Sequence, residues 1–141
     1  MIARIYNNFS EFVTRPVSIA PLVTFRIVFG GVLLYSTVRM LQKGWVHELF
    51  IQPTYHFSFI NGVEPLGERG MYILFFSMAF CAVGIILGLF YRVCSLLFFL
   101  LFTYCELIDK TFYLNHYYLV SILTFWLVIV PANRYYSLDS K

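Results

Sequence analysis

The sequence predicts an all-helical, multi-pass membrane protein, and three observations carry that prediction. Hydrophobic residues make up 60% of the chain and charged residues only 12%, whereas a soluble domain carries about 25% charged residues. The mean hydropathy is +0.77. Residues 71–91 form an uncharged apolar run, which as a helix is about 31 Å long and spans the hydrocarbon of a bilayer. The excess apolar surface therefore has lipid as its solvent.

The charge and cysteine patterns exclude other classes of function. The formal net charge is +3 and is spread along the chain without a basic cluster, so we expect no nucleic-acid partner. Cys81, Cys94 and Cys105 all lie in apolar runs. They lack the spacing of a metal or redox site and are typical of buried thiols. We therefore expect no metal cofactor.

The order of apolar and polar segments predicts one membrane domain over residues 1–141, with about four membrane-spanning helices. Residues 1–17 carry apolar side chains at helical spacing and predict a short helix in the membrane interface. An aromatic loop broken by proline and glycine is expected at 42–70, lying on or dipping into the interface. The expected spans are residues 18–41, 71–91, 92–109 and 110–131.

Small residues within these spans predict where helices approach closely. Gly30 and Gly31 are adjacent in the first span, and Gly84 and Gly88 form a small-xxx-small pattern in the second. Such residues let the backbones of neighbouring membrane helices come together.

Ionisable residues concentrate in one stretch between two apolar runs, ELIDKTFYLNHYYL. On a continuous helix, Asp109, Tyr113 and His116 would share one face. The alternative is a wetted turn in which Asp109 and Lys110 are simply solvated, with Glu106 and Lys110 forming a helical ion pair.

Ionisable side chains at membrane depth are functional hypotheses, because each is costly in hydrocarbon. His116 lies deep enough for this argument, and its alternative is a packed membrane histidine. Arg26 lies about two turns into the first span. We expect it to pair with Glu106 or Asp109 inside the bundle.

Four motifs give the chain a family resemblance. FRIVFGG begins at residue 25, GLFYR at 88, IDKT at 108 followed by NHYY at 115, and ANRYYSLD at 132. The last three resemble the GLCYR, LDKT…NNHSY and ANHYWSVD elements of the vitamin K-dependent gamma-glutamyl carboxylases and their bacterial relatives. FRIVFGG resembles the start of their shared horizontally transferred transmembrane (HTTM) domain. The likeness is specific over residues 87–139 and looser before them.

The resemblance implies a membrane enzyme that oxygenates reduced vitamin K, or a related quinol, to its epoxide. The strong base so produced removes a proton from a glutamate of a peptide substrate, and carbon dioxide adds to the carbanion. Asn115 and His116 match the family's active-centre pair, with the histidine serving the carboxylation half. Structural or orienting roles are expected for Asp109, Lys110, Tyr113, Arg26 and Arg92.

Two departures from the family pattern shape the expected function. The family's Asn-Asn-His reads Leu114-Asn115-His116, and its tryptophan after DKT reads Tyr113. The family's deprotonating lysine lies in a later KKLD…DW-like element, which residues 1–141 do not contain. We therefore expect the N-terminal membrane portion of a carboxylase-like protein, incomplete for catalysis alone.

Its expected partners are the lipid bilayer, the C-terminal half of the enzyme and a glutamate-containing peptide. The expected location is a bacterial cell membrane or the endoplasmic reticulum membrane. The alternative function is a non-catalytic quinone-binding or structural membrane module.

Overall fold

The computed structural model describes residues 18–112, 114–132 and 137–138. Within these ranges the chain is helical and has no strand, which confirms the predicted fold class. The expected interfacial helix at residues 1–17 lies outside the described residues. The elements are α2 (Ala20–Gln42), the π-helical turn η1 (His47–Ile51), α3 (Gly67–Leu87), α4 (Tyr91–Ile108), the 3₁₀ turn η2 (Lys110–Phe112) and α5 (Asn115–Ile129).

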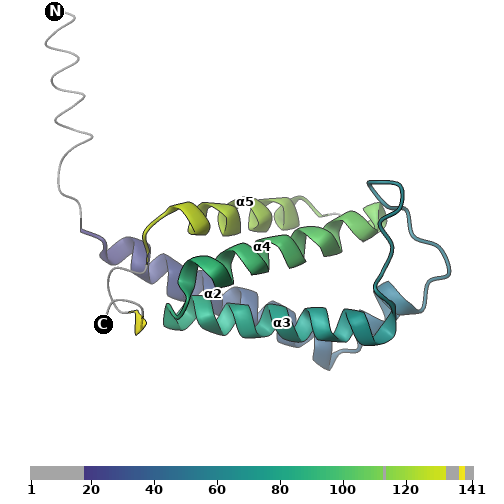
Figure 1. Cartoon of the computed structure of the whole chain (residues 1–141), viewed down its shortest axis with the longest axis horizontal. Helices are drawn as coiled ribbons and strands as arrows, with labels where there is room; N and C mark the ends of the chain where they lie inside the picture. Colours follow the sequence, from purple (N-terminus) through teal and green to yellow (C-terminus); the bar gives the residue numbers. More distant parts are fainter. Residues whose placement is uncertain (1–17, 113, 133–136, 139–141) are drawn as a thin grey trace, which may run out of the picture.

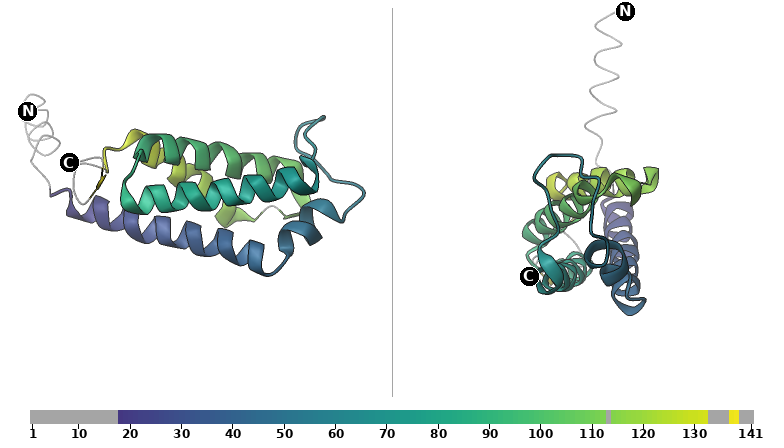
Figure 2. Two further views of the ribbon diagram at one scale, coloured as in Figure 1. Left: turned by 60° about the horizontal axis from the view of Figure 1, so that its bottom comes forward. Right: turned by 90° about the vertical axis from the view of Figure 1, so that its right-hand side faces the viewer.

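The four long helices lie along one axis, and each packs on the next in sequence (Figure 1). α2 contacts α3, α3 contacts α4, and α4 contacts α5. α2 begins and α5 ends at the same end of the bundle, where the α3–α4 turn also lies. The long α2–α3 connection and η2 lie at the opposite end, which we call the loop end (Figure 2).

Three helices are long and apolar enough to cross a membrane. α2 has 23 residues, α3 has 21 and α4 has 18, which gives about 34, 31 and 27 Å against a hydrocarbon core of about 30 Å. α5 has only 15 residues, or about 22 Å, and is shorter than the span expected at 110–131. Asp109 is extended, so α4 stops there and the η2 turn precedes the next helix.

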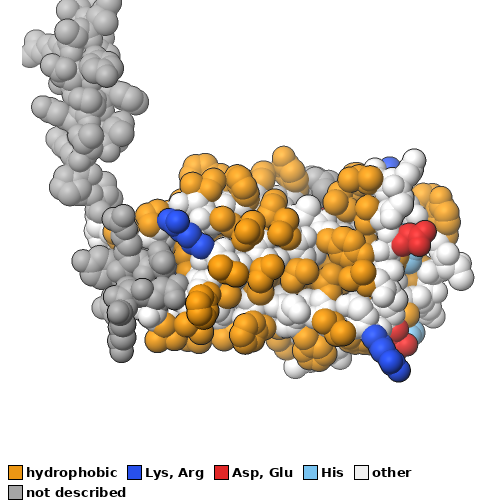
Figure 3. Space-filling view, in the orientation of Figure 1, with side chains coloured by type: hydrophobic (Ala, Val, Ile, Leu, Met, Phe, Trp, Pro, Cys, Tyr) orange, Lys and Arg blue, Asp and Glu red, His pale blue; other side chains and the backbone are white. Residues whose placement is uncertain are grey.

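Large apolar side chains cover the outside of the bundle as well as its core. In Figure 3 the hydrophobic side chains extend over the lengths of the helices, whereas the charged ones appear toward the two ends. Because a soluble bundle places charged residues on its outer face, this surface indicates a membrane protein. Exposed examples on the helices are Val28, Tyr35, Ile73, Phe76, Phe80, Leu100, Trp126 and Ile129.

Glycines set the closest helix contacts. A Cβ on Gly30 would lie 2.8 Å from Ile86 Cγ1 of α3, and one on Gly84 would lie 2.5 Å from Cys94 Sγ of α4. Gly31 has open space around it. Gly88 ends α3 with a φ of 65°, a left-handed conformation that glycine adopts without strain. The sequence therefore indicated the crossing points correctly at Gly30 and Gly84.

We expect Gly84→Ala to destabilise the bundle and Gly31→Ala to leave it almost unchanged. The added methyl group at Gly84 meets the Cys94 side chain and, at 3.3 Å, the backbone oxygen of Leu89. Overpacking of this kind typically costs about 1–3 kcal/mol. Thermal unfolding of both variants in one detergent measures the difference. Equal melting temperatures would show that α3 and α4 are not in the close contact described.

The α2–α3 connection is held to the end of α4 by main-chain hydrogen bonds. The Phe59 amide donates to the Leu107 carbonyl over 3.0 Å, and the Lys110 amide donates to the Phe57 carbonyl over 2.8 Å. These bonds satisfy groups that a helix end leaves without an intrahelical partner. Tyr55, Phe57 and Phe59 are exposed at this end. The position of the loop in the membrane interface stays a prediction.

Arg26 holds together the other end of the bundle. Its side chain is fully buried, and its Nη1 donates to the Ala132 carbonyl over 2.9 Å. Its Nη2 lies 3.5 Å from the Ile86 carbonyl, and the hydroxyl of Ser137 donates to the Gly88 carbonyl nearby over 2.6 Å. Residues from three of the four sequence motifs therefore meet here.

The expected pairing of Arg26 with Glu106 or Asp109 is wrong. The Arg26 guanidinium lies beside the α3–α4 turn. Glu106 follows the start of α4 at Tyr91 by about 22 Å along the helix axis. Among the residues that the structure describes, the carbonyl oxygens of Ala132 and Ile86 accept hydrogen bonds from this guanidinium.

Candidate functional site

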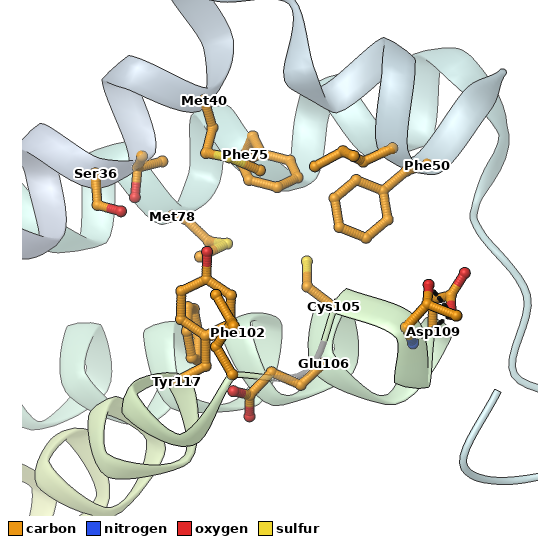
Figure 4. A pocket seen from close by; sticks show the side chains of 14 residues that line it. Ser36, Met40, Phe50, Phe75, Met78, Phe102, Cys105, Glu106, Asp109 and Tyr117 are labelled. Atoms are coloured by element: carbon orange, nitrogen blue, oxygen red, sulfur yellow. Dashed lines mark hydrogen bonds between the residues drawn. The ribbon is translucent and has the colours of Figure 1, made fainter. Parts of the chain in front are cut away.

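A cavity of about 250 Å³ lies inside the bundle near the loop end. α2, η1 and α3 form one wall, and α4 and α5 with their connection form the other (Figure 4). Most of the lining is apolar or aromatic, as is usual for small-molecule sites. It consists of Ser36, Thr37, Met40, Leu49, Phe50, Phe75, Met78, Phe102, Cys105, Glu106, Asp109, Thr111, Leu114 and Tyr117.

Aromatic and sulfur-containing side chains shape the middle of this cavity. Phe50 of η1 packs against Phe75 of α3, with ring centroids 5.8 Å apart. Phe102 of α4 meets Tyr117 of α5 edge to face at 6.0 Å. Figure 4 shows the Cys105 sulfur directed into the space between these groups. The cavity therefore has aromatic rings on opposite walls.

Asp109 sits at the point where α4 ends, and its side chain is only 6% exposed. Its Oδ1 accepts hydrogen bonds from the Thr111 amide over 2.8 Å and from the Thr111 hydroxyl over 2.7 Å. A carboxylate that bonds the backbone two residues ahead fixes a turn. Asp109 therefore orients the η2 turn at the rim of the cavity.

Glu106 lies at the boundary between the cavity and α5. The Ser121 hydroxyl donates to its Oε2 over 2.7 Å. Its Oε1 is buried and has no hydrogen-bond partner in the described part of the chain. Figure 4 shows the carboxyl group on the α5 side of the cavity. A buried oxygen without a hydrogen-bond donor costs free energy.

Asn115 and His116 lie on the first turn of α5, and both side chains are exposed. Their neighbours Leu114 and Tyr117 line the cavity, whereas Asn115 and His116 do not. The His116 ring stands against the Tyr117 ring with centroids 4.5 Å apart. The structure therefore places this pair next to the cavity, on its outer side.

The predicted stripe of Asp109, Tyr113 and His116 on one helix is wrong. α4 ends at Ile108 and α5 begins at Asn115, so Asp109 and His116 belong to different elements. Tyr113 lies outside the described residues. The helical ion pair of Glu106 with Lys110 fails for the same reason.

Two further residues with predicted structural or orienting roles, Lys110 and Arg92, lie outside the cavity. Lys110 is exposed, and its Nζ lies 5.4 Å from the centroid of the Phe59 ring, in a cation–π arrangement. Arg92 is exposed in the first turn of α4, next to the α3–α4 turn. Neither contributes to the lining.

The residues missed as site candidates are Glu106, Cys105 and Tyr117. Glu106 was expected only as an ion-pair partner, of Lys110 or of Arg26. Its signal was a carboxylate in an otherwise apolar helix, with a serine fifteen residues later in the next apolar run. Cys105 and Tyr117 carry no such signal, because an apolar run gives cysteine and tyrosine no distinguishing pattern.

A family model for the HTTM domain matches residues 14–141. This chain belongs to the HTTM domain family. The family links it to the vitamin K-dependent carboxylases, whose motifs the sequence resembles. No solved structure matches the chain. In this HTTM domain, most of the IDKT motif lies in the α4–α5 connection that lines the cavity, and the NHYY motif begins α5. Parts of FRIVFGG, GLFYR and ANRYYSLD meet at the opposite end.

Proposed function

We propose that this HTTM domain binds a quinol, reduced vitamin K or a relative, and forms the membrane portion of a carboxylase-like enzyme. The observation that carries the proposal is the cavity. In a chain of this family, a mainly apolar cavity within the bundle is bounded by the IDKT turn and carries a few convergent polar groups. When bound, the quinol would supply through its oxygenation the strong base for removing a proton from glutamate.

The lining fits the ring of such a ligand. The cavity, at about 250 Å³, is smaller than the pockets of about 300–1,000 Å³ that hold drug-sized ligands. Its size therefore suits the ring of a quinol rather than the whole of a tailed one. Phe50, Phe75 and Phe102 offer ring faces and edges for stacking. The unpartnered Oε1 of Glu106 matches a hydroxyl donor. The residues present therefore fit a quinol head group.

The residues of the chain bind, orient and exclude water in this proposal. Glu106 accepts a hydrogen bond from a quinol hydroxyl while Ser121 holds its other oxygen. Asp109 and Thr111 keep the η2 turn rigid beside it. The apolar walls exclude water from the site. A strong base formed there would therefore be less readily quenched by protonation.

We assign Asn115 and His116 to the carboxylation half of the reaction. Their exposure next to the cavity leaves them accessible to a glutamate-containing peptide or to the segment that carries the base lysine of the family. A hydrogen-bond donor placed at a developing negative charge is worth about 10²–10³ in rate. This assignment gives the pair a role that does not require them to touch the quinol.

His116→Ala is accordingly expected to lower carboxylation by at least about tenfold, which is less than the full effect because water can replace part of the donor. The assay uses membranes in which the chain is completed by the segment that carries the base lysine of the family, and it measures carboxylation of a glutamate-containing peptide. Epoxide formation, measured in the same sample, should fall less. Unchanged carboxylation, or equal loss of both products together with a lower melting temperature, would make His116 a structural residue.

A quinol-binding module without carboxylase activity is the second candidate. The observation that favours it is that Asn115 and His116 lie outside the cavity. Such a module would bind the same ring through the same residues and would not depend on His116 for any product.

Binding of menadiol, the naphthoquinol without a side chain, tests both forms of the proposal. The purified chain in lipid nanodiscs should bind radiolabelled menadiol saturably, and unlabelled menadiol should displace it. Empty nanodiscs give the background from partition into lipid. Uptake by the chain that matches empty nanodiscs and never saturates would overturn the assignment of a quinol site.

A further inference from the structure

A second hollow lies on the outer face of the bundle between α4 and α5. Its volume is about 560 Å³, more than twice that of the cavity. Its walls are mainly apolar and aromatic, with Phe99 and Leu107 from α4 and Ile122 and Phe125 from α5. Ile122 and Phe125 are exposed, so this groove opens on the side where a membrane-spanning helix meets lipid.

One side chain belongs to both hollows. Glu106 lines the cavity and the groove, and Ser121, its hydrogen-bond partner on α5, lines the groove. A hydrogen-bonded carboxyl group therefore stands between the cavity and the outer groove. Its unpartnered Oε1 is buried at this boundary.

We infer that the groove between α4 and α5 binds the isoprenoid chain of a tailed quinol, with Glu106 and Ser121 at the junction between ring and chain. The inference rests on the proposed function, because it places the ring in the cavity. The cavity is below the usual range for a whole ligand, whereas the groove lies within the range of about 300–1,000 Å³. Together they have room for ring and chain.

Tethering to the bound ring favours the isoprenoid tail over a bulk lipid as the occupant of the groove. Lipid tails are as apolar as leucine, so hydrophobicity alone does not select an occupant from the bilayer. A ring bound in the cavity holds its own tail at the groove, which makes the second contact effectively intramolecular. The tail therefore gains an advantage that a free acyl chain lacks.

The test compares three probes in nanodiscs: menadiol, its geranylgeranyl derivative and geranylgeraniol, which is the tail alone. On wild type, the tail should raise the affinity of the ring about tenfold, a modest gain from a tethered second contact. Ile122→Trp fills the groove and should remove that gain while menadiol binds as before. Ile129→Trp is the matched control, because it lies two turns further along the same exposed face of α5 and outside the groove.

Phe99→Trp fills the groove from the α4 side and serves where Ile122→Trp does not fold. Loss of the tail effect in either folded variant, with the control unchanged, supports the inference. A tail gain that survives both would overturn it and leave the quinol site intact. A change in oligomeric state instead of tail binding would make the groove a protein interface and also overturn it.

The ring and tail probes separate this inference from the proposed function. Binding of geranylgeraniol that Ile122→Trp abolishes, without binding of menadiol, would retain a tail site and overturn the quinol proposal. Failure of all three probes to bind would overturn both.

Discussion

Arg26→Met is expected to lower the melting temperature of the detergent-solubilised chain by at least about 10 °C, for a loss of about 3–5 kcal/mol. The guanidinium is fully buried and bridges α2 to the carbonyls of Ala132 and Ile86. Hydrogen bonds from a charged donor contribute about 1.5–3 kcal/mol each. Removing the guanidinium leaves the carbonyl oxygens of Ala132 and Ile86 without this hydrogen-bond donor, at a site where the Arg26 side chain was fully buried.

Arg92→Met is the matched control, because Arg92 is exposed in the first turn of α4. A surface substitution of this kind changes stability by about 0.5 kcal/mol or less. Differential scanning fluorimetry of the two variants against wild type gives the comparison. Equal melting temperatures for the Arg26 and Arg92 variants would contradict the structural role assigned to Arg26.

Cys105→Trp is expected to abolish menadiol binding, weakening it by at least about a hundredfold, because the indole occupies the space that the ring would fill. The Cys105 sulfur points into the middle of the cavity (Figure 4). Cys105→Ala leaves the space open and should bind within about threefold of wild type. Competition binding in nanodiscs measures both affinities.

Leu100→Trp controls for the effect of a tryptophan on the same helix. Leu100 is exposed and lines neither the cavity nor the groove. Retained menadiol binding by Cys105→Trp, in a protein that melts like wild type, would show that the quinol does not enter this cavity.

The fold was predictable because a helix that faces lipid needs a long run of apolar residues, and such runs are visible in the sequence. The uncharged run at 71–91 marked α3 to within four residues at each end. The short α5 was not predictable from hydropathy. Its apolar run begins near Thr111, but the hydrogen bonds of Asp109 to Thr111 divert those residues into a turn.

The site was only partly predictable, because spacing along a helix says nothing once the helix ends. Asp109 was expected and lines the cavity, whereas His116 falls on the exposed side of the next helix. Arg26 was recognised as costly in the membrane, but two of the groups that accept its hydrogen bonds are carbonyls at distant positions in sequence. A carbonyl oxygen is present at every residue, so no sequence pattern distinguishes the ones that accept its hydrogen bonds.

Photo-cross-linking with a diazirine derivative of menadiol, followed by peptide mapping, tests the central claim most directly. The chain in nanodiscs should be labelled at residues that line the cavity, such as Met40, Met78 and Cys105. Excess unlabelled menadiol should suppress that labelling. Label confined to lipid-facing residues such as Phe76 and Leu100, and unaffected by competition, would contradict a quinol site inside the bundle.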